Sequence, residues 1–556
     1  MRDAASEIPT QNPGNLFNPG VALLAKAADM ICLRTHSAAG DSFALLKGDG
    51  MSMTCGEATM RLLADYGVTT VFGASETCAL DGAQGPAGGI NAGSLRYRQG
   101  ADARGAAFMA SGLARASGSV GVAVVQGGAG VAEAVPALAQ GHADSLPMLL
   151  ISVIPAGTPG LGGADPARFT AAMTAFSATA RDIADVPQLL SRAFSLFSSQ
   201  RPRPVHFALP ADLLAELMPE VWQPTRRVDR AEAAAGKLPT AAAMLKEAAR
   251  PVIVLGGGAV EAAGDLQKVI QRCGAVVIST SAGKGIIPDD HPLHLAGALG
   301  TAQARDYLSG ADVVLALGTE LATTGAGHKP LALNGDLIRI DLDPGAIHNP
   351  CPAALGIIGD AAAAMADLAA FLADHDCRRV TAEGAAAVAE LRATLRADLS
   401  VPQQGHLALL GMIRDLAPEQ TLFAGDPSAL VEAGTLGLAV RKPRQWLASP
   451  QHPTLGSAVA VAVGAGLGKP KAPIVGLTTL AGLRRAVPDL TLACELGLPL
   501  PVIVSGAGDL SALAAACGAE GQAPTTRAEF ETAFKTALTA EHPVLIAVPE
   551  EADWSK

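Results

Sequence analysis

Aromatic and charged side chains are scarce in this chain of 556 residues. Phe, Trp and Tyr together make up 3% of the sequence and the four charged types 17%, whereas 49% of the residues are hydrophobic. This composition allows several buried cores, and the length allows two to four domains. With 61 glycines and so few aromatic rings, we expect these cores to be helices packed closely on sheets.

Positive charge is also in short supply. The formal net charge is -11 at pH 7, and no stretch is rich in Lys and Arg. Because nucleic-acid-binding domains concentrate basic residues, the sequence excludes nucleic acid as a main partner. The most apolar run, at 458–467, is far shorter than the ~18 residues of a membrane span. Residues 1–50 lack the layout of a secretion signal, so we expect a cytoplasmic protein without a membrane partner.

Cysteine pairs are absent as well. The chain has eight Cys residues, but they are scattered and none belongs to a C-x-x-C pair. This spacing favours neither a zinc site nor a disulfide framework. We expect reduced thiols, as in a cytoplasmic compartment.

Strand-like and helix-like segments alternate in three successive parts of the chain. This alternation predicts an α/β protein with three doubly wound domains, each built on a parallel sheet. The expected strands are 68–72, 120–125, 148–152, 205–209, 252–255, 276–280, 313–317, 337–342, 421–424, 474–477, 501–505 and 544–548. The expected parts are an N-terminal extension at 1–52, a first domain at 53–214, a linker at 215–238, a second domain at 239–375, a helical linker at 376–403 and a third domain at 404–556.

One stretch, 473–507, carries most of the functional information. It is expected to form a strand, a turn at 478–482, one helix to about Gly497, and a second strand. In a parallel sheet, the turn after a strand faces the ligand crevice. A diphosphate-and-metal site would need an Asp in that turn and another oxygen ligand after the second strand. The chain has Leu480 and Ala507 at these places.

A series of short motifs spans the chain from about residue 53 to 550. They are Gly56-Glu57-Ala58, Val71-Phe72-Gly73, FMASGLAR at 108–115, ADSLPM at 143–148, RPRPVH at 201–206, AGKG at 282–285, DLDP at 341–344 and TLG at 454–456. In this order and spacing, the chain resembles the thiamine diphosphate enzymes of the acetolactate synthase and 2-oxo-acid decarboxylase group. The resemblance implies a pyrimidine-binding domain, a central Rossmann-like domain and a diphosphate-binding domain. It also implies a homodimer or homotetramer that uses thiamine diphosphate and magnesium, with FAD in some members.

The chain departs from that family at the residues that matter for catalysis. The family's Glu, which activates the cofactor, falls on Ala103, and a methyl group cannot transfer a proton. The family's G-D-G motif falls on Thr479-Leu480-Ala481, and its Asn falls on Ala507. The loop and helix that follow the Asn in the family are shortened here, directly after Asp509.

These departures predict a family member that has lost the ordinary metal- and thiamine diphosphate-dependent reaction, with no metal and no cofactor. Such a chain would be a pseudoenzyme that regulates a protein partner, or an enzyme that reuses the crevice. The alternative is an active decarboxylase or carboligase of a 2-oxo acid with unusual cofactor anchoring.

Polar candidates for a reused crevice, and residues for its vestigial cofactor-binding walls, can be named. The polar candidates are Asp102, Arg104, Gln126, His142, Glu432, His452 and Asp509, with Arg96, Arg98 and Arg104 available to attract a small anionic ligand. The vestigial crevice would comprise Gly128, Gly130, Thr479, Leu480, Ala481 and Ala507.

Overall fold

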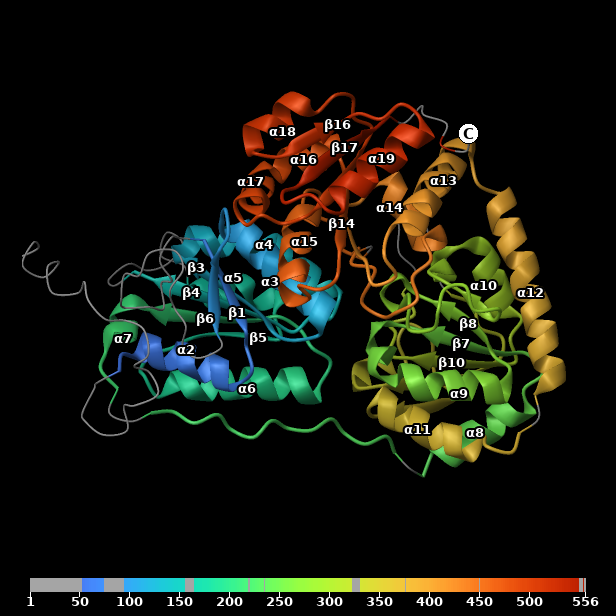
Figure 1. Cartoon of the computed structure of the whole chain (residues 1–556). Helices are drawn as coiled ribbons and strands as arrows, with labels where there is room; N and C mark the ends of the chain where they lie inside the picture. The colour runs from blue at the N-terminus through green and yellow to red at the C-terminus, as the bar shows by residue number, and fades with distance from the viewer. Residues whose placement is uncertain are drawn as a thin grey trace, which may run out of the picture. The chain divides into compact units, whose positions relative to one another are not determined.

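Three parallel sheets organise the chain in the computed structural model (Figure 1). The structure describes residues 53–74, 95–155, 165–218, 221–234, 236–322, 331–375, 377–449, 451–549 and 554. The extension predicted at 1–52 lies outside the described residues. The three sheets belong to one compact unit, and each is covered by helices, which confirms the predicted α/β class. We call the parts first, second and third domain after the sheets they contain.

The first domain has a six-stranded sheet of order β2-β1-β3-β4-β6-β5. Its strands are β1 (Thr70–Gly73), β2 (Arg96–Gln99), β3 (Gly121–Gln126), β4 (Met148–Ile154), β5 (Phe176–Thr179) and β6 (Val205–Pro210). Its helices are α2 (Cys55–Asp65), α3 (Ala103–Ser117), α4 (Gly127–Ala143), α5 (Pro166–Thr170), α6 (Asp185–Ser199) and α7 (Ala211–Ala215), with a 3-10 turn at Ala171–Met173. Helices α3 and α4 cover one face, and α2 and α6 cover the other (Figure 1). A capping box of Thr54 and Glu57 begins α2, and Gly118 ends α3 with a φ of 76°.

The second domain has a six-stranded sheet of order β12-β11-β10-β7-β8-β9. Its strands are β7 (Pro251–Leu255), β8 (Val276–Ser279), β9 (His294–Leu295), β10 (Val313–Leu317), β11 (Asp336–Asp341) and β12 (Leu355–Ile358). Its helices are α8 (Leu238–Glu247), α9 (Ala263–Cys273), α10 (Ala302–Ser309), α11 (Ala361–Phe371) and α12 (Arg378–Ala397), with 3-10 turns at Gly257–Ala262, Ser281–Gly283, Ala298–Gly300 and Pro344–Ala346. Four central strands, β7, β8, β10 and β11, are buried almost throughout, as expected for a parallel sheet with both faces covered.

The third domain has a five-stranded sheet of order β13-β14-β15-β17-β16. Its strands are β13 (Leu422–Gly425), β14 (Ile474–Thr479), β15 (Pro501–Ser505), β16 (Glu520–Gln522) and β17 (Val544–Val548). Its helices are α13 (Val401–Leu416), α14 (Ala429–Gly437), α15 (Ala458–Gly468), α16 (Leu480–Arg485), α17 (Val487–Glu495), α18 (Ser511–Cys517) and α19 (Arg527–Ala537). Helices α13, α14 and α19 pack on one face, and α15 to α18 on the other.

The segment between β14 and β15 differs from its prediction. Thr478 and Thr479 belong to the strand, and helix α16 begins directly at Leu480 instead of after a five-residue turn. The predicted single helix is two helices, α16 and α17, which meet at Ala486. Pro488 lies in the first turn of α17, where the missing N–H of proline is tolerated and a new helix is favoured.

Helices α3 and α15 bring the first and third domains together. A Cβ on Gly112 would collide with the backbone of Val461, and one on Gly464 with the backbone of Met109. These glycines therefore let the two backbones approach closely. Both faces of this interface are apolar and belong to one continuous hydrophobic core.

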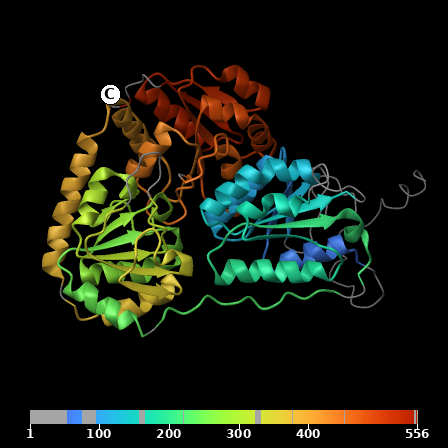
Figure 2. The same ribbon diagram turned by 180° about the vertical axis from the view of Figure 1, so that it is seen from behind.

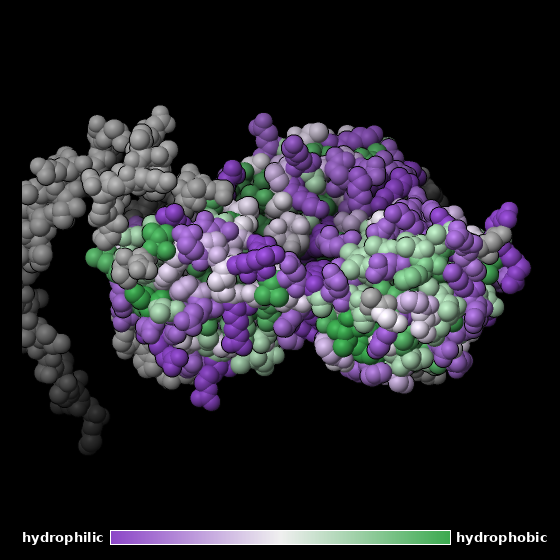
Figure 3. All heavy atoms as spheres, turned by 90° about the horizontal axis from the view of Figure 1, so that it is seen from below, coloured by the Kyte–Doolittle hydropathy of each residue, from purple (hydrophilic) through white to green (hydrophobic). Residues whose placement is uncertain are grey.

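The connection between the first and second domains is an extended segment. Residues 221–234 contain neither helix nor strand, as Figure 2 shows from behind. Hydrophilic side chains and small hydrophobic patches alternate on the face shown in Figure 3. None of the described helices combines the length and apolar character that a membrane span requires.

Candidate functional site

The carboxyl ends of β14 and β15 lie side by side in the third domain. The two strands pair in parallel, with Thr479 opposite Ser505. Thr479 is the N-cap of α16, and its hydroxyl accepts a hydrogen bond from the Gly482 amide at 3.1 Å. Leu480 packs at the edge of the hydrophobic core, and Ala507 is 2% exposed. The strand ends therefore present two apolar side chains and a hydroxyl already used as a cap.

The carboxylate of Asp426 contacts this edge of the sheet through Thr478 of β14. Asp426 follows β13 and is fully buried. One oxygen accepts from the amides of Ser457 (2.8 Å) and Ala458 (3.0 Å), and the other from the Thr478 hydroxyl (2.5 Å). Burial raises the pKa of this carboxyl, while these hydrogen bonds oppose the rise. Asp426 thus caps α15 and ties it to β14, and both of its oxygens are occupied.

Ala103, which stands at the position that the resemblance assigns to the family's Glu, begins helix α3. Ala103 is the first residue of α3 and is buried. Its neighbour Asp102 is the N-cap and accepts from the Gly105 amide at 2.6 Å. The Asp102 carboxylate is therefore used to begin the helix. Arg104 extends to the third domain, where it donates to the Gly456 carbonyl at 2.7 Å.

The glycines predicted for the crevice lie in the first turn of α4. Gly128 is half-buried and Gly130 is buried. A Cβ on Gly130 would lie 3.6 Å from that of Ala103, so this turn and the start of α3 are neighbours. Gln126 is the N-cap residue of α4 and its side chain makes no capping bond.

The remaining candidates differ in their burial and in the elements that carry them. Glu432, His452, Asp509 and Ala481 are exposed. Asp509 accepts hydrogen bonds from the Ser511 hydroxyl and from the Ser511 amide, and these bonds lower the pKa of its carboxyl. Arg96 and Arg98 lie on the edge strand β2. Burial lowers the pKa of His142, and Arg203 and Arg201 lower it further.

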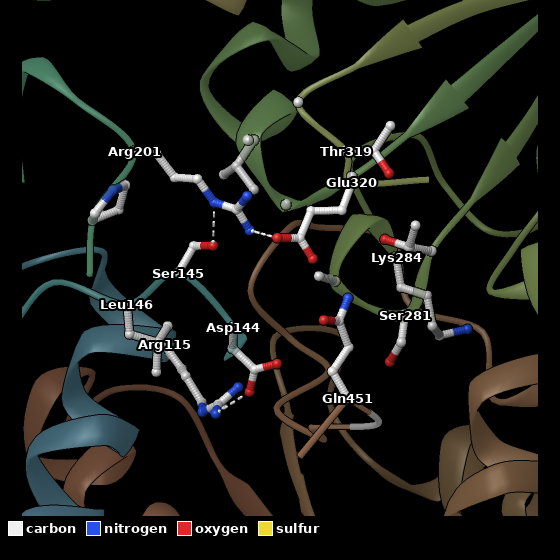
Figure 4. Close-up of a pocket in the computed structure, with 18 of the residues that line it drawn as sticks. Arg115, Asp144, Ser145, Leu146, Arg201, Ser281, Lys284, Thr319, Glu320 and Gln451 are labelled. Atoms are coloured by element: carbon white, nitrogen blue, oxygen red, sulfur yellow. Dashed lines mark hydrogen bonds and ion pairs between the residues drawn. The ribbon is translucent and has the colours of Figure 1, made fainter. Parts of the chain in front are cut away.

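A cavity of about 350 Å³ lies between the three domains (Figure 4). The first domain contributes Arg115, Asp144, Ser145 and Arg201. The second contributes the turns after β7, β8 and β10, and the third contributes Arg444, Trp446 and Gln451. Arg201 donates to the Ser145 hydroxyl and pairs with Glu320 of the second domain at 2.5 Å. This volume is within the range of small-molecule sites.

Every cation in the cavity lining is paired with a carboxylate. The pairs are Arg115–Asp144, Arg201–Glu320, Arg230–Asp360, Lys284–Asp289 and Arg444–Glu261. Two buried polar atoms of the lining, by contrast, have no hydrogen-bond partner, the Ser281 hydroxyl and the Trp446 ring N–H. Since buried polar groups are nearly always satisfied in folded proteins, these two atoms are exceptions among the residues that line the cavity.

Comparisons with known proteins identify the family to which the chain belongs. Residues 53–157 match the model for the N-terminal TPP binding domain of thiamine pyrophosphate enzymes, and residues 238–368 match the central domain. A protein of Pseudomonas aeruginosa named "Probable 2-ketoarginine decarboxylase AruI" is 37% identical over 464 residues, which cover 82% of both chains. The chain belongs to the thiamine pyrophosphate enzyme family. The resemblance found in the sequence is thereby confirmed.

Two further similar proteins have lower sequence identity to the chain. The acetolactate synthase isozyme 3 large subunit of Escherichia coli is 28% identical over 484 residues, covering 82% of both chains. A solved structure from Mycobacterium smegmatis, assigned as a thiamin diphosphate-dependent enzyme, has a TM-score of 0.75 and 19% identity. It covers 90% of this chain and 99% of its own. This last likeness shows the fold alone.

The family's cofactor does not fit the residues at the strand ends. Magnesium takes oxygen ligands, yet the two positions that the resemblance in the sequence assigns to the family's ligands are Leu480 and Ala507. Both oxygens of the nearby Asp426 carboxylate already accept hydrogen bonds from the chain. A buried diphosphate without a metal would be strongly unfavourable.

Sequence reasoning missed the cavity between the domains. Its signal in the sequence was Gly256-Gly257-Gly258 after β7, a weak pattern without the rest of a nucleotide-binding motif. Ser281 and Trp446 belong to different domains, and no local pattern links them. Only the folded chain brings them to one cavity.

Proposed function

We propose that this chain is a thiamine pyrophosphate family protein that no longer performs the family's metal-dependent reaction and acts instead by binding a small molecule. One observation carries the proposal, the pair of apolar residues Leu480 and Ala507 at two adjacent strand ends. Ala103 at the start of α3 supports it, because the proton-transferring carboxylate is missing from the facing domain.

The binding role is supported by the cavity between the three domains. Its lining cations are neutralised by carboxylates of the same chain, so an anion would gain little from them. The unpartnered Ser281 and Trp446 atoms both can donate a hydrogen bond. An uncharged molecule with carbonyl or hydroxyl acceptors suits this lining better than the small anion expected from the sequence. Binding among three domains would also couple their positions, as a regulatory member requires.

Adding thiamine diphosphate and magnesium in excess should leave the melting temperature of this chain unchanged. Ligand at 100 times its Kd would stabilise the native state by about 2.7 kcal/mol, which a thermal unfolding scan detects easily. The variant Leu480→Asp/Ala507→Asn returns oxygen donors to both strand ends, and we expect it to gain a magnesium-dependent shift. A clear shift of the unaltered chain would contradict the proposal. Release of carbon dioxide from 2-ketoarginine or pyruvate would favour the alternative, an active 2-oxo-acid decarboxylase.

Replacing Ser281 with alanine should stabilise the ligand-free protein by about 1 kcal/mol, because it removes a buried hydroxyl that has no partner. Ser279, two residues earlier, is the matched control. It accepts from the Gly297 amide at 2.9 Å and pairs with His294 at 3.0 Å. Ser279→Ala should therefore destabilise by about 1–3 kcal/mol. Urea unfolding of both variants measures the difference, and equal losses would argue against an unfilled polar site at Ser281.

A homodimer or homotetramer, a protein partner and a cytoplasmic location stay predictions for this chain. The relative from Escherichia coli is named a large subunit, which supports an assembly in that protein. Light scattering of the purified chain would give its own oligomeric state.

A further inference from the structure

Arg104 links the first domain to the third. It lies in the first turn of α3, and its guanidinium donates to the carbonyls of Gly456 (2.7 Å) and Leu455 (3.3 Å) in the turn before α15. The same guanidinium lies 3.7 Å from the carboxylate of Asp489 on α17. One side chain of the first domain therefore contacts two separate elements of the third.

Asp489 is the most buried carboxylate of this contact. It is 1% exposed, and its Oδ1 atom has no hydrogen-bond partner. It faces α3 at Gly105, where a Cβ would collide with Oδ1. An oxygen of the Asp102 carboxylate lies 3.1 Å from the same Cβ position. The charged groups around Asp489 are thus Asp102 and Arg104 of α3 and Asp426 after β13.

The burial of Asp489 depends on the contact between the two domains. Asp489 belongs to the third domain, while Gly105, Asp102 and Arg104 belong to the first. The glycine-lined contact of α3 and α15 holds the two surfaces together. If the domains separated, Asp489 would lose α3 as a neighbour and would meet water.

We propose that Arg104 and Asp489 form a clasp between the first and third domains, and that closing this clasp takes up a proton on Asp489. The clasp makes the contact between the two domains sensitive to pH in the neutral range. The proposal does not depend on the proposed function, because it concerns a contact within the chain.

The electrostatics of Asp489 give the sign of the effect. Burial, and then the charge of Asp102, raise its pKa from 3.8 to about 7, while Arg104 acts in the opposite direction. Between these two values, the closed state holds one proton more than the open state. Closure is therefore favoured as the pH falls from 7 toward 4, by about tenfold per pH unit. Above the raised pKa, closure no longer depends on this group.

Hydrogen exchange of the full chain tests the proposal. Peptides that cover α3 and α15 should be about tenfold better protected at pH 6 than at pH 8, after correction for the intrinsic exchange rates. Asp489→Asn should abolish this pH dependence, because no proton is then exchanged. Arg104→Gln should weaken protection at pH 8 and should move the pH dependence upward, since the cation that holds the pKa of Asp489 down is gone. Arg484→Gln, an exposed charge on α16, is the matched control and should behave as the unaltered chain.

Two outcomes would overturn the proposal. The first is equal protection of α3 and α15 at pH 6 and pH 8 in the unaltered chain, a result that needs no variant to fold. The second is an unchanged pH dependence in Asp489→Asn. A loss of protection in Arg104→Gln that is the same at both pH values would reduce Arg104 to a structural contact without proton coupling.

Discussion

Replacing Asp289 with alanine should lower the free energy of unfolding by about 3–5 kcal/mol, because it leaves a buried charge without its partner. Lys284 Nζ lies 2.7 Å from Asp289 Oδ2, and their side chains are 1% and 4% exposed. Asp289 also accepts from the amides of Gly285 (3.2 Å) and Val440 (3.1 Å). The alanine variant would thus leave an ammonium and two amides unsatisfied between the second and third domains. Urea unfolding gives the loss directly.

The neighbouring Asp290 supplies a matched control. It also joins the second domain to the third, through Arg441 at 2.8 Å, but both side chains are about half exposed. Since exposed pairs contribute little, Asp290→Ala should leave stability almost unchanged. The double variant Lys284→Met/Asp289→Leu removes both buried charges and should lose less than Asp289→Ala alone. If Asp289→Ala and Asp290→Ala lost the same amount, burial would not be what makes the first pair important.

The core strands of all three sheets could be predicted from the sequence because they are continuous apolar runs. Val252, Ile253 and Val254, for example, are fully buried in β7. Of the six edge strands, β13 was predicted at 421–424, whereas β2, β5, β9, β12 and β16 were not. Strand β2 is Arg-Tyr-Arg-Gln, and β9 is two residues long, so neither carries a hydrophobic pattern. Their pairing partners alone define them as strands.

Some residues of the candidate site could be located from local sequence patterns, and others could not. Leu480 and Ala507 follow strands that periodicity predicts, so their place at the sheet edge could be anticipated. Asp102 and Arg104 were expected to be crevice residues, but their side chains begin a helix and bridge two domains. Asp289 with Val440, and Arg104 with Asp489, meet across domain boundaries. Such contacts depend on how domains pack, which local sequence does not encode.

Acid should destabilise this chain through two buried histidines, by about 3 kcal/mol each between pH 6.5 and 4. Burial lowers the pKa of His206 and of His294 from 6.5 to about 4. Between these values the unfolded chain binds protons that the folded chain excludes. Stability is therefore fully present above pH 6.5 and falls as the pH drops toward 4.

The contacts of His206 explain why its ring stays neutral in the folded chain. Its two ring nitrogens contact the hydroxyls of Ser152 (2.8 Å) and Thr170 (2.7 Å), and the Thr170 hydroxyl donates to the Ala167 carbonyl. That arrangement assigns the single ring proton to Nδ1, so Nε2 accepts from Ser152. A second proton would charge the ring inside the core of the first domain, where the weak influence of Asp165 does not offset the loss of water.

The variant His206→Gln separates this effect from the rest of the acid response. A glutamine side chain fits the contacts with Ser152 and Thr170 less well than the imidazole ring, so we expect the variant to be less stable at pH 8. Unlike the histidine, the glutamine cannot be protonated. The fall in urea midpoint between pH 8 and pH 5 should therefore be smaller than in the unaltered chain. His452→Gln, at an exposed site, should keep the full fall. An unchanged fall in His206→Gln would mean that other groups, among them His294, set the acid sensitivity.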